Sequence, residues 1–246
     1  MKALVKYASG PGNVGLRDVP VPEPDRDEVL IRVKYCGICG TDLHIEADEF
    51  PNAPPVIMGH EFCGTIVRAG EGAAERFRPG DRVVGEIHTG ACGVCSLCRA
   101  GQPHICDQKL ALGSKTDGAF AEYLALPAWL VHHLPDGIPW EVAGITEPLA
   151  ISTHCLIERG RLGAGQSVLI SGSATMGLMA TILASRLGAT TIIVSGTDLD
   201  APMRLPLARA LGATHTVNVQ RERLRDVVLG ATDGRGVDVW IDCSGA

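Results

Sequence analysis

Four cysteines lie close together in the first half of the chain, with the spacing C-x₂-C-x₂-C-x₇-C. They are Cys92, Cys95, Cys98 and Cys106. Four thiolates complete the tetrahedral coordination of a Zn²⁺ ion and leave no position open for a substrate. The spacing therefore predicts a structural zinc site that does no chemistry itself.

A second group of residues has the types that a catalytic metal requires. Cys39 offers a thiolate, His60 an imidazole and Glu61 a carboxylate, and all three are known zinc ligands. Thr41 and His44 add a hydroxyl and an imidazole to the same short segment as Cys39, which suits a proton relay. Each residue alone has an ordinary structural explanation, so the combination is what indicates a catalytic site.

A turn that could bind a dinucleotide follows the predicted strand at residues 167–171 and opens a predicted helix at 176–187. Its sequence, GSATMG at 172–177, has Ala174 in place of the middle glycine of G-x-G-x-x-G. The context is right for pyrophosphate binding, but a plain strand-to-helix turn remains the alternative. The candidate cofactor-binding residues of this turn are Gly172, Ala174, Met176 and Gly177.

An acidic residue that binds the cofactor ribose is expected about 20 residues after the turn. Gly196 occupies the end of the next predicted strand, where that residue normally stands, and Asp198 or Asp200 could replace it from a longer loop. Arg204 is the first arginine available for the 2′-phosphate of NADP, which Asp198 would repel. The sequence therefore favours NAD over NADP as cofactor.

The composition restricts the possible partners. The 246 residues are 46% apolar and 20% charged, with a formal net charge of −6. Without a Lys/Arg-rich stretch, neither nucleic acid nor an anionic membrane is expected as a partner. With no run of 18 apolar residues and no signal peptide, we predict a cytoplasmic protein. In such a reducing compartment the nine cysteines indicate metal binding instead of disulfides.

The two halves of the chain differ in texture. Residues 1–150 are rich in proline and in short apolar runs (29–33, 64–69 and 81–85), which predicts a mostly antiparallel, barrel-like domain. A helical pattern at 141–157 is expected to break at Pro148. Residues 151–246 alternate strands with helices, which is typical of a parallel α/β sheet. Besides the first strand and helix, this part contains predicted strands at 190–195, 215–219 and 237–242 and a helix at 206–211.

Several motifs together resemble one family. The chain is similar to the zinc-containing medium-chain dehydrogenase/reductase (alcohol dehydrogenase) family, and within it to the sorbitol and L-threonine dehydrogenase branch. The motifs are GICGTDLH at 37–44, GHEFCG at 59–64, GDRVV at 80–84, the four-cysteine segment and TEPLA at 146–150. The resemblance covers essentially the whole chain.

The resemblance implies an α/β protein with a GroES-like β-barrel catalytic domain at 1–150 and an incomplete Rossmann domain at 151–246. It implies hydride transfer between a secondary alcohol (a polyol, a diol or an L-threonine-like substrate) and NAD(P), with one catalytic and one structural zinc ion. In this reading Cys39, His60 and Glu61 bind the catalytic zinc, and Thr41 and His44 relay the proton. Glu147 lies near the metal, although a carboxylate at a helix start is its alternative role. Family members of full length are expected to form homo-oligomers.

The chain ends at Ala246 after four predicted strands, where this fold normally has six, so we expect a C-terminally truncated chain. An inactive remnant that keeps only zinc binding is therefore the alternative function. A zinc-ribbon nucleic-acid module is disfavoured by the net charge, and a zinc-free quinone reductase by both cysteine sets. Cys36, Cys63, Cys155 and Cys243 are expected to pack in the interior, and the six remaining histidines receive no role.

Overall fold

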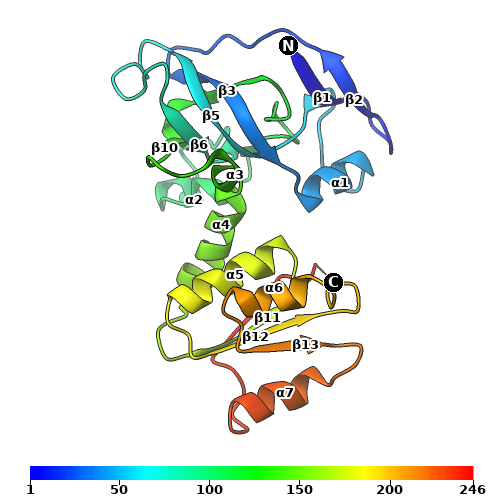
Figure 1. The fold of residues 1–246 in the computed structure, drawn as a ribbon. Helices are drawn as coiled ribbons and strands as arrows, with labels where there is room; N and C mark the ends of the chain where they lie inside the picture. The colour runs from blue at the N-terminus through cyan, green and yellow to red at the C-terminus, as the bar shows by residue number, and fades with distance from the viewer. Residues whose placement is uncertain (246) are drawn as a thin grey trace. The chain divides into compact units, whose positions relative to one another are not determined.

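The computed structural model describes residues 1–245, which form two compact units (Figure 1). The first runs to Glu147 and the second begins at Pro148. The boundary falls inside helix α4 (Thr146–Thr153).

The first unit is built on antiparallel β-sheets. Its three-stranded sheet has the order β2-β1-β4, and its five-stranded sheet has the order β10-β6-β5-β3-β9. A two-stranded ribbon pairs β7 with β8. The strands are β1 (Lys2–Lys6), β2 (Val14–Asp18), β3 (Glu28–Gly37), β4 (Val56–Ile57), β5 (Glu61–Ala69), β6 (Arg82–Gly85), β7 (His88–Thr89), β8 (Leu110–Ala111), β9 (Tyr123–Pro127) and β10 (Val131–His133).

The five-stranded sheet curls around the main apolar core of this unit. Val29 and Ile31 of β3, Phe62 and Ile66 of β5 and Leu126 of β9 are almost completely buried in it. The pairing of β3 with β5 shifts register twice along its length, and such bulges bend and twist strands locally. The barrel-like, antiparallel first domain predicted from the sequence is confirmed.

Short helices and loops connect these strands. They are α1 (Gly40–Glu46), α2 (Ser96–Arg99), the 3₁₀ turns η1 (Pro103–Ile105) and η2 (Ala128–Leu130), and α3 (Trp140–Ala143). The predicted helical break is displaced: it falls at Gly144 and Ile145, between α3 and α4, and not at Pro148. Pro148 lies in the first turn of α4, where a backbone N–H has no intrahelical acceptor to lose.

The second unit is a parallel sheet with the strand order β13-β12-β11-β14. Its strands are β11 (Ser167–Ser171), β12 (Thr191–Gly196), β13 (His215–Asn218) and β14 (Val239–Asp242), and its helical elements are the π-helical turn η3 (His154–Arg159), α5 (Thr175–Arg186), α6 (Arg204–Ala210) and α7 (Leu224–Ala231). Within this unit α5 and α6 cover one face of the sheet and α7 the other (Figure 1). All four predicted strands are confirmed to within two residues.

The two faces of this sheet are apolar because both are covered by helices. Along β11, Val168 and Ile170 pack on the α5 side, whereas Leu169 packs on the α7 side. β14 forms an edge of the sheet, as expected. The strand order reverses between β11 and β14, and the crevice at such a switch point is where open α/β sheets bind ligands.

Candidate metal and cofactor sites

Strand register brings the first candidate metal site together. Gly37, the last residue of β3, pairs with Glu61, the first residue of β5. Cys39 follows two residues later as the N-cap of α1. The ligand atoms of Cys39, His60 and Glu61 all lie within 4.8 Å of one another. The residue at 37 has to be small, because a Cβ there would lie 2.3 Å from Glu61 Oε2.

The interior position of these groups changes their acidity. Burial raises the pKa of Glu61, although His60 and the Cys39 thiol act in the opposite direction. Burial likewise raises the pKa of the Cys39 thiol. Both anionic forms are therefore held in an environment that lacks sufficient compensating positive charge. A divalent cation would supply that charge, so these three ligand groups fit a zinc ion.

Asp42 is a neighbour of this cluster that the sequence patterns did not single out. Its side chain is buried; Oδ2 accepts the Cys39 backbone N–H at 2.9 Å, and Oδ1 lies 3.6 Å from His60 Nδ1. Asp42 Oδ1 has no hydrogen-bond partner among the described residues. A metal on the other ring nitrogen would keep the proton on His60 Nδ1, which faces this orphaned oxygen. The site therefore fits zinc held through a carboxylate–histidine pair.

Replacing Asp42 by asparagine should weaken the site without removing a ligand. We expect Asp42→Asn to lower zinc affinity or kcat/KM by about 10- to 100-fold, because the carboxylate orients His60 and increases its basicity. Zinc retention against a chelator measures the first and steady-state kinetics the second. Asp18→Asn, which changes an exposed aspartate paired with Lys2, is the control. Zinc affinity and activity equal to the unchanged protein would contradict this role.

Three further predicted residues lie on α1 and α4. Thr41 Oγ1 lies 3.6 Å from Cys39 Sγ. His44 is exposed, and its Nδ1 lies 2.9 Å from Glu49 Oε2, a partner that the sequence analysis did not anticipate. Burial raises the pKa of Glu147, and nearby His60 and Glu61 act on it in opposite directions. The structure thus places Glu147 beside the candidate ligands, while Thr41 and His44 both belong to α1.

The four clustered cysteines have the geometry of a zinc–sulfur tetrahedron. Their Sγ atoms lie within 4.8 Å of one another, with separations of 3.6 Å for Cys92–Cys106, 3.9 Å for Cys92–Cys98 and 4.0 Å for Cys95–Cys106. A Zn–S distance of about 2.3 Å gives sulfur–sulfur distances of about 3.8 Å in a tetrahedron. All nine cysteines are free thiols, so this grouping does not arise from disulfides.

Backbone amides point at these sulfurs. Cys95 donates its N–H to Cys92 Sγ, and Cys98 donates its N–H to Cys95 Sγ, each at 3.4 Å. Gln108 donates to Cys106 Sγ at the same distance. N–H groups from Val94 and Cys95 lower the pKa of Cys92. Backbone N–H groups also lower the pKa of Cys106, whereas burial raises that of Cys98. The segment thus favours the thiolate, the form that binds metal, at Cys92 and Cys106.

The predicted dinucleotide turn joins β11 to α5. Gly172 has φ +92°, and a Cβ at Gly177 would lie 1.9 Å from the Gly172 carbonyl oxygen, so both positions require glycine. Ala174 is the N-cap of α5, with φ −76°, and tolerates its methyl group. No side chain caps this helix among the described residues. Its first N–H groups, including that of Met176, are therefore available to a phosphate.

The loop after β12 brings one of the two candidate acids close to Gly196. A Cβ at Gly196 would lie 2.9 Å from the Cβ of Asp200 and 2.8 Å from Ser173 Oγ in the dinucleotide turn. Asp200 thus occupies the space of a side chain at the strand end. Burial raises its pKa, but hydrogen bonds from Thr197 and Arg204 outweigh that and lower the pKa to about 2. The carboxylate is charged at neutral pH.

The second acid of this loop is used differently. Asp198 Oδ1 accepts from Asn218 Nδ2 at 2.7 Å and from Arg221 Nε at 2.6 Å. Its charge is therefore paired, which weakens the repulsion of a 2′-phosphate expected from the sequence. Arg204 is also paired, with Nη1 2.9 Å from Asp200 Oδ1.

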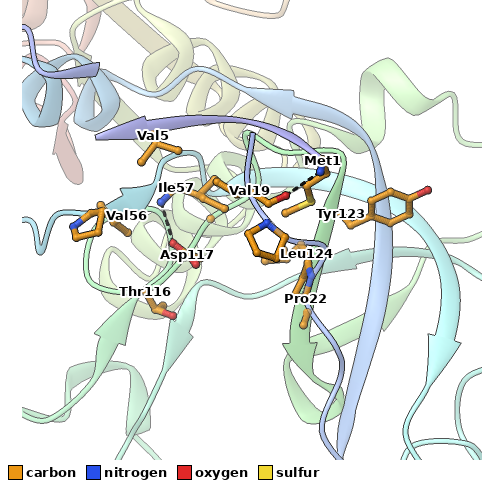
Figure 2. A pocket seen from close by; sticks show the side chains of 14 residues that line it. Met1, Val5, Val19, Pro22, Val56, Ile57, Thr116, Asp117, Tyr123 and Leu124 are labelled. Atoms are coloured by element: carbon orange, nitrogen blue, oxygen red, sulfur yellow. Dashed lines mark hydrogen bonds between the residues drawn. The ribbon is translucent and has the colours of Figure 1, made fainter. Parts of the chain in front are cut away.

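One cavity of the first unit contains few groups that could bind a metal ion or a cofactor. It encloses about 460 Å³ between β1, β4 and β9 and is lined mainly by apolar side chains such as Val19, Ile57 and Leu124 (Figure 2). Its carboxylate, Asp117, accepts the Ile57 N–H at 2.9 Å, and the Met1 ammonium donates to the Val19 carbonyl. These polar groups are engaged in holding the fold.

The cysteines outside both clusters are less buried than expected. Cys63 is fully buried, whereas Cys36, Cys155 and Cys243 are half-buried.

Among the described residues no helix is both long and apolar enough to cross a membrane.

Comparison with known proteins identifies two matching families. Residues 25–136 match the alcohol dehydrogenase GroES-like domain, and residues 175–246 match the zinc-binding dehydrogenase family. Sorbitol dehydrogenase of Halalkalibacterium halodurans is 39% identical over 246 residues, and L-threonine 3-dehydrogenase of Anaeromyxobacter sp. (strain Fw109-5) is 43% identical over 249. Each match covers all of this chain and 71% of the relative.

Solved structures agree with this grouping. A zinc-binding dehydrogenase from Sinorhizobium meliloti 1021, crystallised with NADP, has a TM-score of 0.90 and 37% identity, covering all of this chain and 70% of that one. Alcohol dehydrogenase TADH from Thermus sp. ATN1 has a TM-score of 0.89 and 33% identity, covering all of this chain and 71% of that one. With matches to both families, relatives of about 40% identity that it covers to 71%, and GroES-like and Rossmann folds, the chain belongs to the zinc-binding alcohol dehydrogenase family.

Proposed function

We propose that this chain transfers hydride between a secondary alcohol and NAD, using a catalytic zinc site in residues 1–150 and a nucleotide site in residues 151–246. The main support is that the ligand atoms of Cys39, His60 and Glu61 lie close together. The buried Asp42 Oδ1, which has no hydrogen-bond partner among the described residues, adds to it. Relatives named for sorbitol and L-threonine suggest polyols, diols or hydroxyamino acids as substrates.

The roles of the residues follow from their chemistry. Zinc held by Cys39, His60 and Glu61 supplies a Lewis acid that lowers the pKa of the alcohol hydroxyl. Thr41, beside Cys39 on α1, accepts the hydroxyl proton and passes it towards His44. Glu49 hydrogen-bonds His44 Nδ1 and so stabilises the imidazolium when the proton arrives. The Cys92–Cys106 cluster holds a second zinc ion that is structural.

Glu147 has a separate role. Its carboxylate lies near His60 and Glu61 in a buried setting that raises its pKa. We assign it to the surroundings of the metal, where its negative charge would offset part of the positive charge of a zinc ion held by Cys39, His60 and Glu61. The alternative role at the start of α4 also places it in the first helical turn, where a carboxylate is stabilised by the helix dipole.

In the second unit we assign the pyrophosphate to the turn at Gly172–Gly177 and the adenosine ribose to Asp200. Two observations support Asp200: its Cβ lies 2.9 Å from the position of a Cβ at Gly196, and its carboxylate is ionised. A carboxylate accepts hydrogen bonds from the two free ribose hydroxyls of NAD. Its repulsion of a 2′-phosphate is weakened here by the ion pair between Asp200 and Arg204. The assignment of NAD rests on Asp200. Asp198 lies in the same loop, and Arg204 follows it at the start of α6.

Replacing Asp200 by asparagine tests the cofactor assignment. Losing a hydrogen bond to a charged acceptor costs about 1.5–3 kcal/mol. Asp200→Asn should therefore weaken NADH binding by about 10- to 100-fold. It should also lower the ratio of the NADH affinity to the NADPH affinity. Nucleotide fluorescence titration of both cofactors measures this. Asp198→Asn, in the same loop, is the matched control and should alter the NADH affinity much less. Tighter binding of NADPH than NADH by the unchanged protein would refute the assignment.

The proposed function as a whole is tested by a substrate screen. Polyols, diols, L-threonine and simple alcohols are offered with each cofactor, and reduced nicotinamide is followed by absorbance while zinc content is measured. Turnover of a secondary alcohol with two zinc ions per chain is the expected result. Zinc binding without turnover or saturable NADH binding would instead support the inactive remnant.

A further inference from the structure

A second cavity in the first unit differs in chemistry from the apolar one. It encloses about 490 Å³. Its lining includes Phe50, Pro51, His88, Ile105, Lys109 and Lys115. The two lysines make this a basic surface on a chain whose formal net charge is −6.

Two walls of this cavity belong to segments that contact residues near the candidate metal site. Phe50, in one wall, donates its backbone N–H to the His44 carbonyl at 3.2 Å, so this wall follows directly from α1. The other wall includes Ser114 and Lys115. Beside them Gly113 is packed so closely on Gly59 that a Cβ at 113 would lie 2.7 Å from the Gly59 carbonyl oxygen. Because His60 follows Gly59, this wall is connected through the Gly59–Gly113 contact to the segment that carries a candidate ligand. The candidate ligands themselves do not line the cavity, whereas Cys106 of the cysteine cluster does.

The positive charges of the cavity have no acidic partners. Lys109 is half-buried; its Nζ lies 3.2 Å from His88 Nε2 and donates to the His104 carbonyl. Among residues 1–245 no carboxylate forms an ion pair with Lys109 or Lys115. His88 carries no negative charge that could neutralise the two lysines. Burial and the charge of Lys109 both lower the pKa of His88. Asp107 also lines the cavity, so two lysines face one carboxylate that pairs with neither.

We propose that this cavity is an anion subsite, in which Lys109 and Lys115 bind a carboxylate or phosphate group of the substrate alcohol. The inference rests on the proposed function and specifies its substrate class. Ammonium groups without protein counter-ions attract an anion. The partial burial of Lys109 strengthens that attraction relative to bulk water, whereas Lys115 is exposed. The reacting hydroxyl then lies at the zinc end of the substrate and the anionic group at the lysine end.

Matched substrate pairs test this proposal. Sorbitol 6-phosphate against sorbitol probes phosphate, and 3-hydroxybutyrate against 1,3-butanediol probes carboxylate, because each pair differs in the anionic group. The measured quantity is the ratio of kcat/KM for the anionic to the uncharged member. We expect a ratio above one for at least one pair, falling about tenfold or more in Lys115→Met and in Lys109→Met. Lys34→Met, an exposed lysine on β3 outside the cavity, should leave the ratio unchanged.

Direct binding separates this inference from the proposed function. Inorganic phosphate is titrated calorimetrically into the zinc-loaded protein and into Lys115→Met, with no turnover required. Binding to the first that is lost in the second supports the subsite even if no alcohol is oxidised. Absence of phosphate binding together with substrate ratios of one or less overturns the subsite, while oxidation of uncharged alcohols would still uphold the proposed function.

Lys109 needs one additional control, because its backbone N–H donates to the Cys106 carbonyl beside the cysteine cluster. Zinc content is therefore measured for each variant. Suppose that Lys109→Met loses zinc while Lys115→Met leaves both ratios and phosphate binding unchanged. Lys109 then stabilises the cysteine cluster, and the subsite is refuted. Retained zinc with a reduced ratio in both variants supports it.

Discussion

Replacing Cys39 with serine is expected to abolish turnover while leaving the fold intact. The thiolate is one of three clustered ligands, and serine is a poor zinc ligand because its hydroxyl remains protonated near neutral pH. Loss of Lewis-acid stabilisation worth several kcal/mol lowers kcat/KM by about 10³-fold or more. The variant should contain one zinc ion fewer per chain, with unchanged far-UV circular dichroism. Kinetics, metal analysis and spectroscopy on the same sample measure all three quantities.

Cys36→Ser is the matched control for this substitution. Cys36 lies three residues before Cys39 and is also half-buried, but its Sγ faces its neighbour's carbonyl, that of Gly37 at 3.7 Å. Its replacement should leave the zinc content unchanged. Full activity in Cys39→Ser would show that the catalytic centre has been assigned to the wrong residues.

The second large effect concerns stability. Cys98→Ser should remove the other zinc ion and destabilise the first unit by about 4 kcal/mol or more, at the upper end of single substitutions. For a chain of this size that corresponds to a fall in Tm of about 10 °C. The physical reason is that none of the hydrophobic clusters of the described residues includes any residue from 92 to 106. The metal therefore replaces a core in holding this segment.

Cys155→Ser, a half-buried thiol outside both clusters, controls for the loss of a cysteine as such. Differential scanning calorimetry and zinc analysis measure the two effects, and a chelator should reproduce the loss of stability in the unchanged protein. If Cys98→Ser keeps two zinc ions and its original Tm, the cluster does not serve as a structural metal site.

Local sequence patterns were sufficient for the second unit. The strands at 167–171 and 190–195 were predictable because buried parallel strands are short apolar runs bounded by turn residues. The shift of the helical break from Pro148 to Gly144 and Ile145 was not predictable. It depends on whether the proline falls in the interior or in the first turn of a helix, and periodicity alone does not locate that turn.

Residue types and close spacing alone indicated a four-cysteine metal site and a candidate dinucleotide turn. These features are local, since Cys92 to Cys106 and Gly172 to Gly177 each lie within one short segment. Only the tertiary structure decided how distant groups meet. The register that sets Gly37 against Glu61, the burial of Asp42 against His60 and the return of Asp200 to the strand end at Gly196 are all examples. Such contacts depend on strand pairing and packing between distant segments, which local sequence patterns do not encode.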